Sequence, residues 1–548
     1  MGWKIFWLLP CAANLDILLP VSRCTPGGGG IASYDAVVIG AGHNGLVAAN
    51  YLAKAGLRVA VVERSDRVGG ASVTDEIAPG FKVSAAAYVS GLFRPQIIED
   101  LELSKYGLRQ IAFDPQAFCP FPDGRSLLLW SDVERTCKEV ARFSKKDAEG
   151  YRRYSAFWDS FYELIEPMLL SPPVPVADLV DLMRGPEAEE LMRRLLFYSA
   201  EELLEEYFES PEVKAALANQ SIIGHFAGPS SPCTAFTLSH NLLGNINGVV
   251  GAWGFTVGGM GGIPDALAKA ARARGVEILL NAPAERIVTA NGRTTGVRLA
   301  DGRVLESRAV LSSADPKRTF LGMVEPDALP SEFLRAVSHI KIHGAAMKVN
   351  CALSELPEWT ARPGGLGPHH RGSAYLCPSI EYAEVAFADA KRGIPSRAPW
   401  MEVVTQSVLD PSVAPPGKHT LSVYVQYTPY RLASNSWDDI REAYADTVLE
   451  TLAQYAPNVS DAVLAREVLT PLDLERRFGL TEAHQSHGEM GPDQFFSFRP
   501  VPGWSTYRMP IRGLYLCGAG THPGGGVMGA PGYNGAQAVI EDWASLKA

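Results

Sequence analysis

Short apolar runs and helically spaced apolar residues alternate near the start of the chain. Residues 34–39 form an apolar run that predicts a buried parallel strand. Residues 45–54 then place apolar side chains at helical spacing, and Gly56 follows at a position where helices commonly end. A second apolar run, at 57–63, predicts another strand. This stretch of about thirty residues therefore predicts a complete β-α-β unit.

The pattern changes between residues 145 and 220, where apolar and charged residues alternate at helical spacing over long stretches. This predicts a mostly helical insert. Residues 254–315 return to a mixed pattern, with a helix near 264–274 and then strand-like runs separated by Asn-Gly and Asp-Gly pairs, which are typical of hairpin turns. A helix is expected over 437–455. The chain ends with a strand, a glycine-rich loop and a final helix.

A glycine-rich turn joins the first predicted strand to the first predicted helix. It matches the pattern G-x-G-x-x-G, whose glycines allow a tight turn, close approach to a pyrophosphate, and close packing of helix on strand. The N–H groups at the start of the helix attract phosphates. Glu63 follows the third glycine by 18 residues and can accept hydrogen bonds from an adenosine ribose. We therefore expect a dinucleotide site, rather than a purely structural turn, formed by Gly40, Ala41, Gly42, His43, Asn44, Gly45 and Glu63.

The residues that follow Glu63 indicate which dinucleotide is bound. Arg64 is followed by the pair Gly69 and Gly70, which resembles the extended signature of FAD-binding flavoproteins. In that signature a second diglycine closes over the cofactor, and a dehydrogenase that uses only a nicotinamide does not need it. FAD is therefore the expected cofactor, and Arg64, Gly69 and Gly70 are added to its site.

A second glycine-rich loop, at 518–531, precedes the final helix. Pro531 suits the first turn of that helix, whose start directs positive partial charge toward a reduced flavin ring. We expect the flavin end of the site to be formed by Gly518, Gly525, Gly526, Val527 and Met528. His522, in the same loop, is a tentative catalytic candidate. The alternative interpretation of His522 is a structural role, as a loop histidine that is hydrogen-bonded to the backbone.

Composition and charge exclude some function classes. The chain has 548 residues, a formal net charge of −10 and 47% hydrophobic residues. An acidic chain without a basic stripe does not predict binding to nucleic acid. No histidine and cysteine cluster has the spacing of a metal site, so no metal is expected. The length predicts several domains or subdomains.

The eight cysteines argue against a dithiol mechanism. No two of them have the spacing C-x-x-C or C-x4-C, which disulphide reductases need to pass electrons from flavin to a disulphide. Apart from residues 524–529 of the C-terminal loop, which are assigned to the flavin, the sequence has no second G-x-G-x-x-G pattern of the kind needed for NAD(P)H. The sequence therefore predicts one tight dinucleotide site, occupied by FAD, and not a dithiol disulphide reductase.

Residues 1–33 are expected to form an N-terminal tail outside the fold. The apolar stretch at 5–13 has the outline of a secretory signal, but Asn14 and Asp16 interrupt it and no clean cleavage site follows. The segment is too interrupted to span a bilayer, so no transmembrane segment is expected. Its chemistry does not decide where the protein is located.

Three stretches resemble the phytoene desaturase and carotenoid isomerase branch of FAD oxidoreductases: "VVIGAGHNGLVAA", "GAWGFTVGGMGGIPDAL" and "LYLCGAGTHPGGGVMGAPG". Within this branch, residues 34–548 resemble a family of animal flavoproteins with bacterial relatives, through segments such as "LTPLDLERRFGL" and "RPVPG". The resemblance implies a mixed α/β (α+β) fold with a discontinuous Rossmann-type FAD-binding domain, a substrate domain and a helical insert. It also implies a location in the mitochondrial matrix, with the cytoplasm as the alternative.

The patterns and the resemblance together give the expected domain boundaries. Because strands and glycine loops of the FAD type occur near both ends of the chain, the FAD-binding domain is assembled from separate stretches. The boundaries are 1–33 for the tail, 34–144 for the first FAD-binding part, 145–250 for the helical insert and first substrate part, 251–330 for the second FAD-binding part, 331–500 for the second substrate part and 501–548 for the C-terminal FAD-binding part.

One segment departs from the pattern of the family. The resemblance implies a glycine pair after "ERRFGLT", but residues 481–486 read "TEAHQS", which places Glu482 and Ala483 there instead. His487 and Glu489 of the same segment are retained. If this loop lines the substrate channel or contacts the flavin, activity depends on the change.

The expected function is removal of a hydride from an unidentified carbon substrate, either a small molecule or a lipid-like one, by an FAD-dependent oxidoreductase. Such a reaction depends more on positioning than on side-chain acid–base chemistry. The final electron acceptor is unknown, and a mitochondrial protein is a candidate partner. Two alternatives stay open. One is an FAD-binding scaffold or regulator with little turnover, suggested by the altered 481–486 loop, and the other is a polyene desaturase or isomerase of the carotenoid type.

Overall fold

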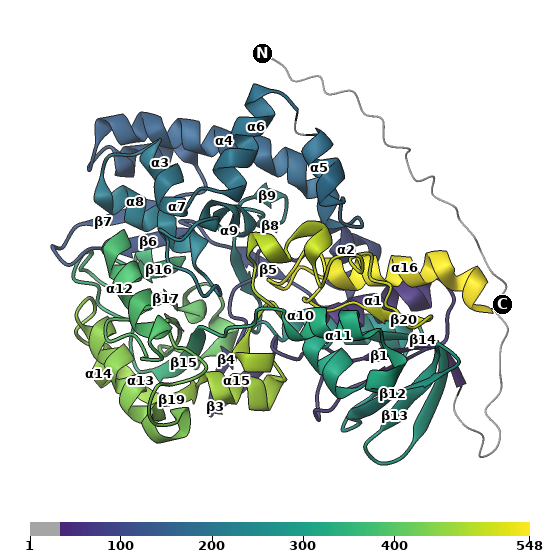
Figure 1. Ribbon diagram of the computed structural model, residues 1–548. Coiled ribbons are helices and arrows are strands. Elements are labelled where there is room, and N and C mark those ends of the chain that lie inside the picture. Colours follow the sequence, from purple (N-terminus) through teal and green to yellow (C-terminus); the bar gives the residue numbers. More distant parts are fainter. Residues whose placement is uncertain (1–32, 183, 548) are drawn as a thin grey trace.

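The computed structural model describes residues 33–182 and 184–547, so the predicted tail, apart from Ser33, lies outside the described residues. Two seven-stranded sheets lie beside each other, with a group of helices above them in the view of Figure 1. Among the described helices, none combines the length and the apolar composition that crossing a bilayer requires.

The first sheet has the strand order β11-β2-β1-β14-β13-β12, and β20 also pairs with β14. Its strands are β1 (Ser33–Ile39), β2 (Val59–Val62), β11 (Glu277–Leu279), β12 (Ala284–Ala290), β13 (Arg293–Leu299), β14 (Val304–Ser312) and β20 (Leu514–Leu516). β1 runs parallel to both β2 and β14, and β20 runs parallel to β14. The predicted β-α-β unit and the predicted Rossmann-type sheet are confirmed, with strands contributed from both ends of the chain.

Three helices pack together on this sheet: α1 (His43–Lys54), α10 (Gly262–Ala273) and α16 (Ala530–Lys547). Small residues allow close contact, because a Cβ atom on Gly532 of α16 would lie only 2.2 Å from the carbonyl oxygen of Asn44. The buried amide of Asn50 links α1 to α10 by donating to the Leu267 carbonyl oxygen at 2.9 Å. These contacts hold the start of α1 in a fixed position over the sheet.

The second sheet has the order β19-β15-β18-β17-β16-β6-β7. Its strands are β6 (Ala117–Pro120), β7 (Ser126–Leu129), β15 (Ala346–Leu353), β16 (Ser373–Leu376), β17 (Trp400–Val404), β18 (His419–Gln426) and β19 (Val463–Leu469). Buried residues of α13 (Trp437–Ala453) pack on its central strands.

The predicted boundary at residue 144 assigns the hairpin of β6 and β7 to the first FAD-binding part. In the structure, this hairpin extends the second sheet and not the FAD-type sheet. β6 pairs in parallel with β16, more than 250 residues later in the chain. A local sequence pattern does not specify a partner at that distance.

Helices α4–α9 form the group above the sheets and match the helical pattern predicted for this region. They are α4 (Lys145–Leu169), α5 (Val176–Leu182), α6 (Pro186–Leu196), α7 (Ala200–Glu205), α8 (Pro211–Ala218) and α9 (Thr234–Asn241). Ser144 caps the start of α4, and Ser199 forms a reciprocal capping box with Glu202. The fully buried carboxylate of Asp147 accepts hydrogen bonds from the N–H groups of Glu209 and Ser210, both at 2.9 Å, which links α4 to the start of α8.

The segment after α15 (Pro471–Phe478) has a backbone conformation that suits glycine. Its sequence nevertheless has Glu482 and Ala483 at the two positions where the family resemblance implies glycines. Gly479 ends α15 with a φ of 70°, and Glu482 and Ala483 have φ values of 49° and 62°. A residue with a Cβ atom is disfavoured in this left-handed region by roughly 1–2 kcal/mol. Glu482 and Ala483 therefore add strain to this loop that glycines at the same positions would avoid.

Replacing Glu482 by glycine should therefore stabilise the protein. Glu482→Gly removes the left-handed strain but increases the freedom of the unfolded chain, so the free energy of unfolding should rise by about 0.5–1 kcal/mol. Chemical denaturation measures this change. Glu482→Gln keeps the strain and removes only the charge, so it should stay within about 0.5 kcal/mol of wild type. A less stable glycine variant would contradict the assignment of strain.

Candidate functional site

The turn between β1 and α1 is shaped for close approach of a ligand. Gly40 has a φ of 96°, and no described side chain caps the start of α1 at Gly42. The first N–H groups of the helix are therefore available to an anion. A Cβ atom on Gly42 would have no described atom within 4 Å, whereas one on Gly45 would lie 2.0 Å from the Gly40 carbonyl oxygen. Gly42 thus faces open space, and Gly45 serves close packing.

The diglycine predicted to close over the cofactor lies directly against this turn. Gly69 donates its N–H to the carbonyl oxygen of Ala41 at 2.9 Å, and Gly69 pairs with Gly42 as an isolated bridge. Gly69 and Gly70 have φ values of 128° and 58°, which favour glycine. The structure therefore brings both predicted nucleotide-binding stretches together, about one strand spacing apart.

Glu63 and Arg64, adjacent in sequence, point to different neighbours. The buried carboxylate of Glu63 accepts the N–H groups of Ala41 at 2.8 Å and Ser65 at 2.9 Å. Each carboxylate oxygen has capacity for a further hydrogen bond, such as one from a ribose hydroxyl. Arg64 instead donates to the carbonyl oxygens of Arg476 and Arg477 at the end of α15, at 3.2 and 2.7 Å. Its contacts link the two sheets, so a direct role with the cofactor stays a prediction.

Two buried polar atoms beside the turn lack partners among the described residues. They are Asn44 Oδ1, in the first turn of α1, and Ser72 Oγ, which follows the diglycine. Buried polar groups in proteins are nearly always hydrogen-bonded. Together with the free N–H groups and the open space at Gly42, these atoms fit a bound group that carries a pyrophosphate.

The C-terminal glycine loop meets the N-terminal turn at Ser313, just after β14. The Ser313 hydroxyl donates to the Ile39 carbonyl oxygen at 2.8 Å. A Cβ atom on Gly40 would lie 2.4 Å from the Ser313 hydroxyl oxygen, and one on Gly518 would lie 2.4 Å from the Ser313 carbonyl oxygen. The two predicted ends of the FAD site therefore lie on either side of one residue, at the carboxyl edge of the parallel strands.

The remainder of the C-terminal loop passes under the 480–490 segment. A Cβ atom on Gly525 would lie 2.3 Å from Ser486 Oγ. Gly526 and Val527 both have positive φ, at 98° and 58°, and the buried Met528 accepts the Arg94 N–H at 3.1 Å. The loop thus runs from the edge of the sheet to the start of α2 (Pro95–Asp100), with the altered segment packed on Gly525.

Uncharged imidazoles line the place where these segments meet. Burial and the nearby His487 lower the pKa of His43 to about 3, and burial lowers the pKa of His487 to about 4 even though Asp315 opposes this. His487 Nδ1 has no partner among the described residues. Both rings are therefore neutral at physiological pH, and within the described residues no cluster of acidic, histidine and cysteine side chains could hold a metal ion.

The 480–490 segment also carries a carboxylate, Glu489, that lies beside two histidines. His484 Nδ1 accepts the N–H of Ser486 at 3.1 Å, so the proton of its ring is on Nε2, which lies 3.4 Å from Glu489 Oε1. His343 Nδ1 lies 3.4 Å from the same oxygen. Although burial alone would raise it, these two histidines hold the pKa of Glu489 well below its usual range. Glu489 is thus an anion between a buried histidine and an exposed one.

His522, the tentative catalytic candidate, is tied to the helical insert. Its Nε2 lies 3.1 Å from the Met168 carbonyl oxygen near the end of α4, so this nitrogen carries the ring proton. Burial lowers the pKa of His522 to about 4. This contact agrees with the alternative interpretation, a loop histidine bonded to backbone, and leaves only Nδ1 for other partners.

Sequence reasoning assigned no role to two buried cations. Arg499 donates to the Ala519 carbonyl oxygen at 2.8 Å and to the Glu489 carbonyl oxygen at 3.0 Å, so it fixes the 480–490 segment to the C-terminal loop. Lys348 is buried within β15, donates to Ser422 Oγ and lies 3.8 Å above the Tyr88 ring. The available signal for Lys348 was one charged residue inside an otherwise apolar strand pattern.

Lys348 can exchange a proton near neutral pH. Burial lowers the pKa of Lys348 to about 7, although Glu402 and Glu467 oppose this shift. Glu402 itself accepts the Tyr88 hydroxyl at 2.5 Å. A titratable group with a strongly shifted pKa in such an interior is a candidate functional group. It lies between the second sheet and the segment that follows the diglycine, because Asn350 of the same strand donates to the Ala85 carbonyl oxygen at 3.1 Å.

Comparison with known proteins agrees with the cofactor deduced from the site. The family model "Flavin containing amine oxidoreductase" matches residues 45–540. The chain is 42% identical to the rat pyridine nucleotide-disulfide oxidoreductase domain-containing protein 2, over 93% of this chain and 94% of the relative. It is 26% identical to a lycopene-forming phytoene desaturase of Pseudescherichia vulneris, over 92% of this chain and 99% of the relative. The predicted resemblance to both groups is confirmed.

Solved structures show the same fold. An oxidoreductase from Methanosarcina mazei aligns with a TM-score of 0.60 at 19% identity, over 92% of this chain and 99% of that one. The glycine turn, the second diglycine and the returning C-terminal loop fit FAD, which is the cofactor of this chain. The chain therefore belongs to the flavin containing amine oxidoreductase family and is an FAD-dependent oxidoreductase.

Proposed function

We propose that the chain removes a hydride from a carbon atom of a small-molecule or lipid-like substrate. When bound, FAD supplies the hydride acceptor. The observation that supports the proposal is the meeting of the two glycine loops at Ser313, close to the neutral imidazoles of His43 and His487. The phytoene desaturase relative is named for a dehydrogenation, which supports chemistry at carbon.

The chain's own residues suit this reaction. The first turn of α1, the diglycine and Glu63 would hold the adenosine and pyrophosphate parts of FAD, and the loop from Gly518 to Met528 would hold its flavin end. His43 and His487 stay uncharged, so they do not disfavour an apolar substrate. Oxidation at carbon also releases a proton, and the amine of Lys348 is the buried group best able to accept one at neutral pH.

The cysteines support a mechanism without a dithiol. Cys119, Cys137, Cys351, Cys377 and Cys517 are free and buried. Burial raises the pKa of Cys517, which comes directly before the C-terminal loop, so its thiol stays protonated and is a weak nucleophile. We accordingly propose that the chain is not a disulphide reductase. We further propose the mitochondrial matrix as its location, on the basis of family resemblance.

The central test is to purify the chain and record its flavin spectrum. We expect one FAD per chain, slow or no bleaching by NADPH, and reduction by one member of a panel of alcohols, amines and polyenes with an artificial acceptor. Reduction by a polyene would identify a desaturase. Flavin that no organic donor reduces would contradict the proposal and favour the FAD-binding scaffold, and rapid bleaching by NADPH alone would show a nicotinamide-dependent enzyme.

A matched pair of glycine variants tests the cofactor site. Gly42→Ala places a methyl group in the open space beside the turn, so the chain should fold normally but lose at least about tenfold of its FAD content. Gly45→Ala forces a contact with the Gly40 carbonyl oxygen and should lower the free energy of unfolding by about 1–3 kcal/mol. Absorbance at the flavin band and denaturation of the cofactor-free protein separate these effects. Full FAD content in Gly42→Ala would refute the assignment.

The role of Lys348 is tested by Lys348→Met. The variant should keep FAD, but its flavin should be reduced at least about a hundredfold more slowly by the substrate that the donor panel identifies. Because only the neutral amine accepts a proton, the wild-type rate should rise with pH through about 7, and the variant should lack this rise. Stopped-flow measurements give both results. Lys269→Met, an exposed change on α10, is the control, and equal pH profiles in all three proteins would exclude Lys348 as the proton acceptor.

A further inference from the structure

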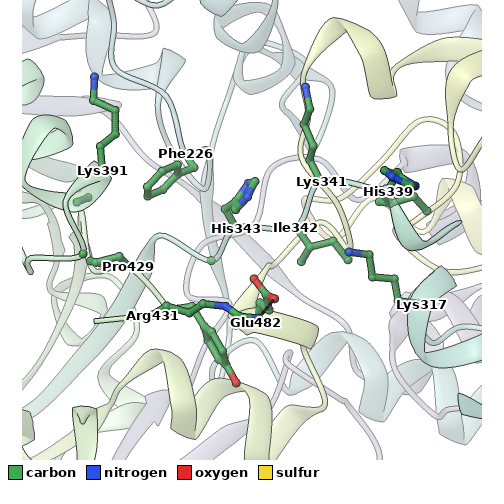
Figure 2. Close-up of a pocket in the computed structure, with 15 residues that line it drawn as sticks. Phe226, Lys317, His339, Lys341, Ile342, His343, Lys391, Pro429, Arg431 and Glu482 are labelled. Atoms are coloured by element: carbon green, nitrogen blue, oxygen red, sulfur yellow. Dashed lines mark hydrogen bonds and ion pairs between the residues drawn. The ribbon is translucent and has the colours of Figure 1, made fainter. Parts of the chain in front are cut away.

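A pocket of about 470 Å³ opens on the surface next to the 480–490 segment. It is lined by residues from the chain leading into β15, from the end of α12 (Ile380–Lys391), from the turn after β18 and from the altered loop. Its volume lies within the range of small-molecule sites in proteins. Figure 2 shows Phe226 and His343 near the middle of the pocket, with lysines around it.

The pocket is strongly basic, although the chain as a whole has a net charge of −10. Six of its lining residues carry basic side chains, and Glu482 is the one acid among the described residues that line it. The six are Lys317, His339, Lys341, His343, Lys391 and Arg431. Basic side chains gathered in a concave surface attract anions and raise their local concentration.

Only some of this positive charge is neutralised by neighbouring acids. Arg431 pairs with Glu482 at 2.8 Å, and Lys341 pairs with Asp493 at 2.9 Å. Lys317 forms no ion pair with the described residues, and Figure 2 shows its amine directed toward Ile342. Arg431 is highly exposed, with 80% of its side-chain surface accessible, so its pair with Glu482 is weak and exchangeable.

Apolar residues also line the pocket. Ile340 and Ile342 are buried, Pro429 lies in the turn after β18, and the Phe226 ring stands 5.7 Å from the His343 ring, centre to centre. A concave site with apolar walls and a few convergent charged groups is the usual form of a small-molecule site. The combination fits a ligand with an anionic head and an apolar body.

We propose that this pocket binds an organic anion whose carboxylate or phosphate group is held by Arg431 and Lys317, with its apolar part against Phe226 and Ile342. On binding, Arg431 exchanges Glu482 for the head group of the ligand. Glu482 therefore acts as an internal competitor, in a position where the family resemblance implies glycine. This binding proposal does not depend on the reaction proposed above.

One loop, the 480–490 segment, connects the pocket to the predicted flavin end of the site. Glu482 lies on the pocket side of the 480–490 segment, and Ser486 packs on Gly525 on the other side. His343, at the centre of the pocket, joins Glu489 and thereby the buried His484. A ligand that displaces Glu482 from Arg431 consequently bears on the same segment that covers the C-terminal glycine loop.

Binding is tested by calorimetry on the FAD-bound protein with four eight-carbon probes: octanoate, octyl phosphate, octanol and octylammonium. Both anions should bind more tightly than octanol, and octylammonium should not bind. The tighter of the two anions identifies the head group as carboxylate or phosphate. Equal binding of all four probes, or of none, would overturn the proposal whether or not the flavin can be reduced.

Two variants with opposite expected effects locate the binding site. Lys317→Ala should weaken binding of the tighter anion about threefold to tenfold, and Glu482→Gln should strengthen it about threefold, since the competing charge is removed. Unfolding could cause the loss of binding expected for Lys317→Ala, but it could not cause the gain expected for Glu482→Gln. Lys269→Ala, on the exposed face of α10, is the control and should leave binding unchanged. Binding that none of the pocket variants alters would place the anion elsewhere and overturn the assignment.

Discussion

The hydrogen bond from the Ser313 hydroxyl to the Ile39 carbonyl oxygen is the contact around which the site is built. Parallel pairing brings the ends of β1, β14 and β20 to the same edge of one sheet, and three glycines then crowd the residue that joins them. There is no room for a Cβ atom on Gly40 or Gly518 at this point. Close packing of backbone, more than any single side chain, therefore brings the predicted adenosine end and the predicted flavin end of the site together.

The 480–490 segment, which follows β19 and α15, packs against the C-terminal glycine loop. Arg499 holds it to the C-terminal loop through backbone carbonyl oxygens, and Glu489 joins it to the chain leading into β15. The left-handed backbone at Glu482 persists without glycine because these surrounding contacts determine the path of the loop. The segment thus lines the basic pocket through Glu482 and packs on Gly525 through Ser486.

Features that depend on neighbouring residues could be predicted from sequence, and features that depend on distant pairing could not. The strand, glycine turn, helix and second strand near the N-terminus are specified by local pattern, and Glu63 lies where that pattern places it. The pairing of β6 with β16 joins segments far apart in the chain, so the boundary expected at 144 did not anticipate it. Lys348 and Arg499 acquire their environments only when separate segments enclose them, and the contacts of Arg64 with α15 arise in the same way.

The position of β20 has a consequence for how the protein is made. The FAD-type sheet contains strands from residues 33–39 and from residues 514–516, so this sheet is completed only after residue 516 has left the ribosome. Pairings between such distant segments form slowly, because the entropy of closing a long loop must first be overcome. Until then, the apolar edge of β14 that receives β20 is exposed to other chains. Assembly of this protein in a cell is therefore expected to depend on chaperones that shield this edge, and on cofactor arriving after synthesis.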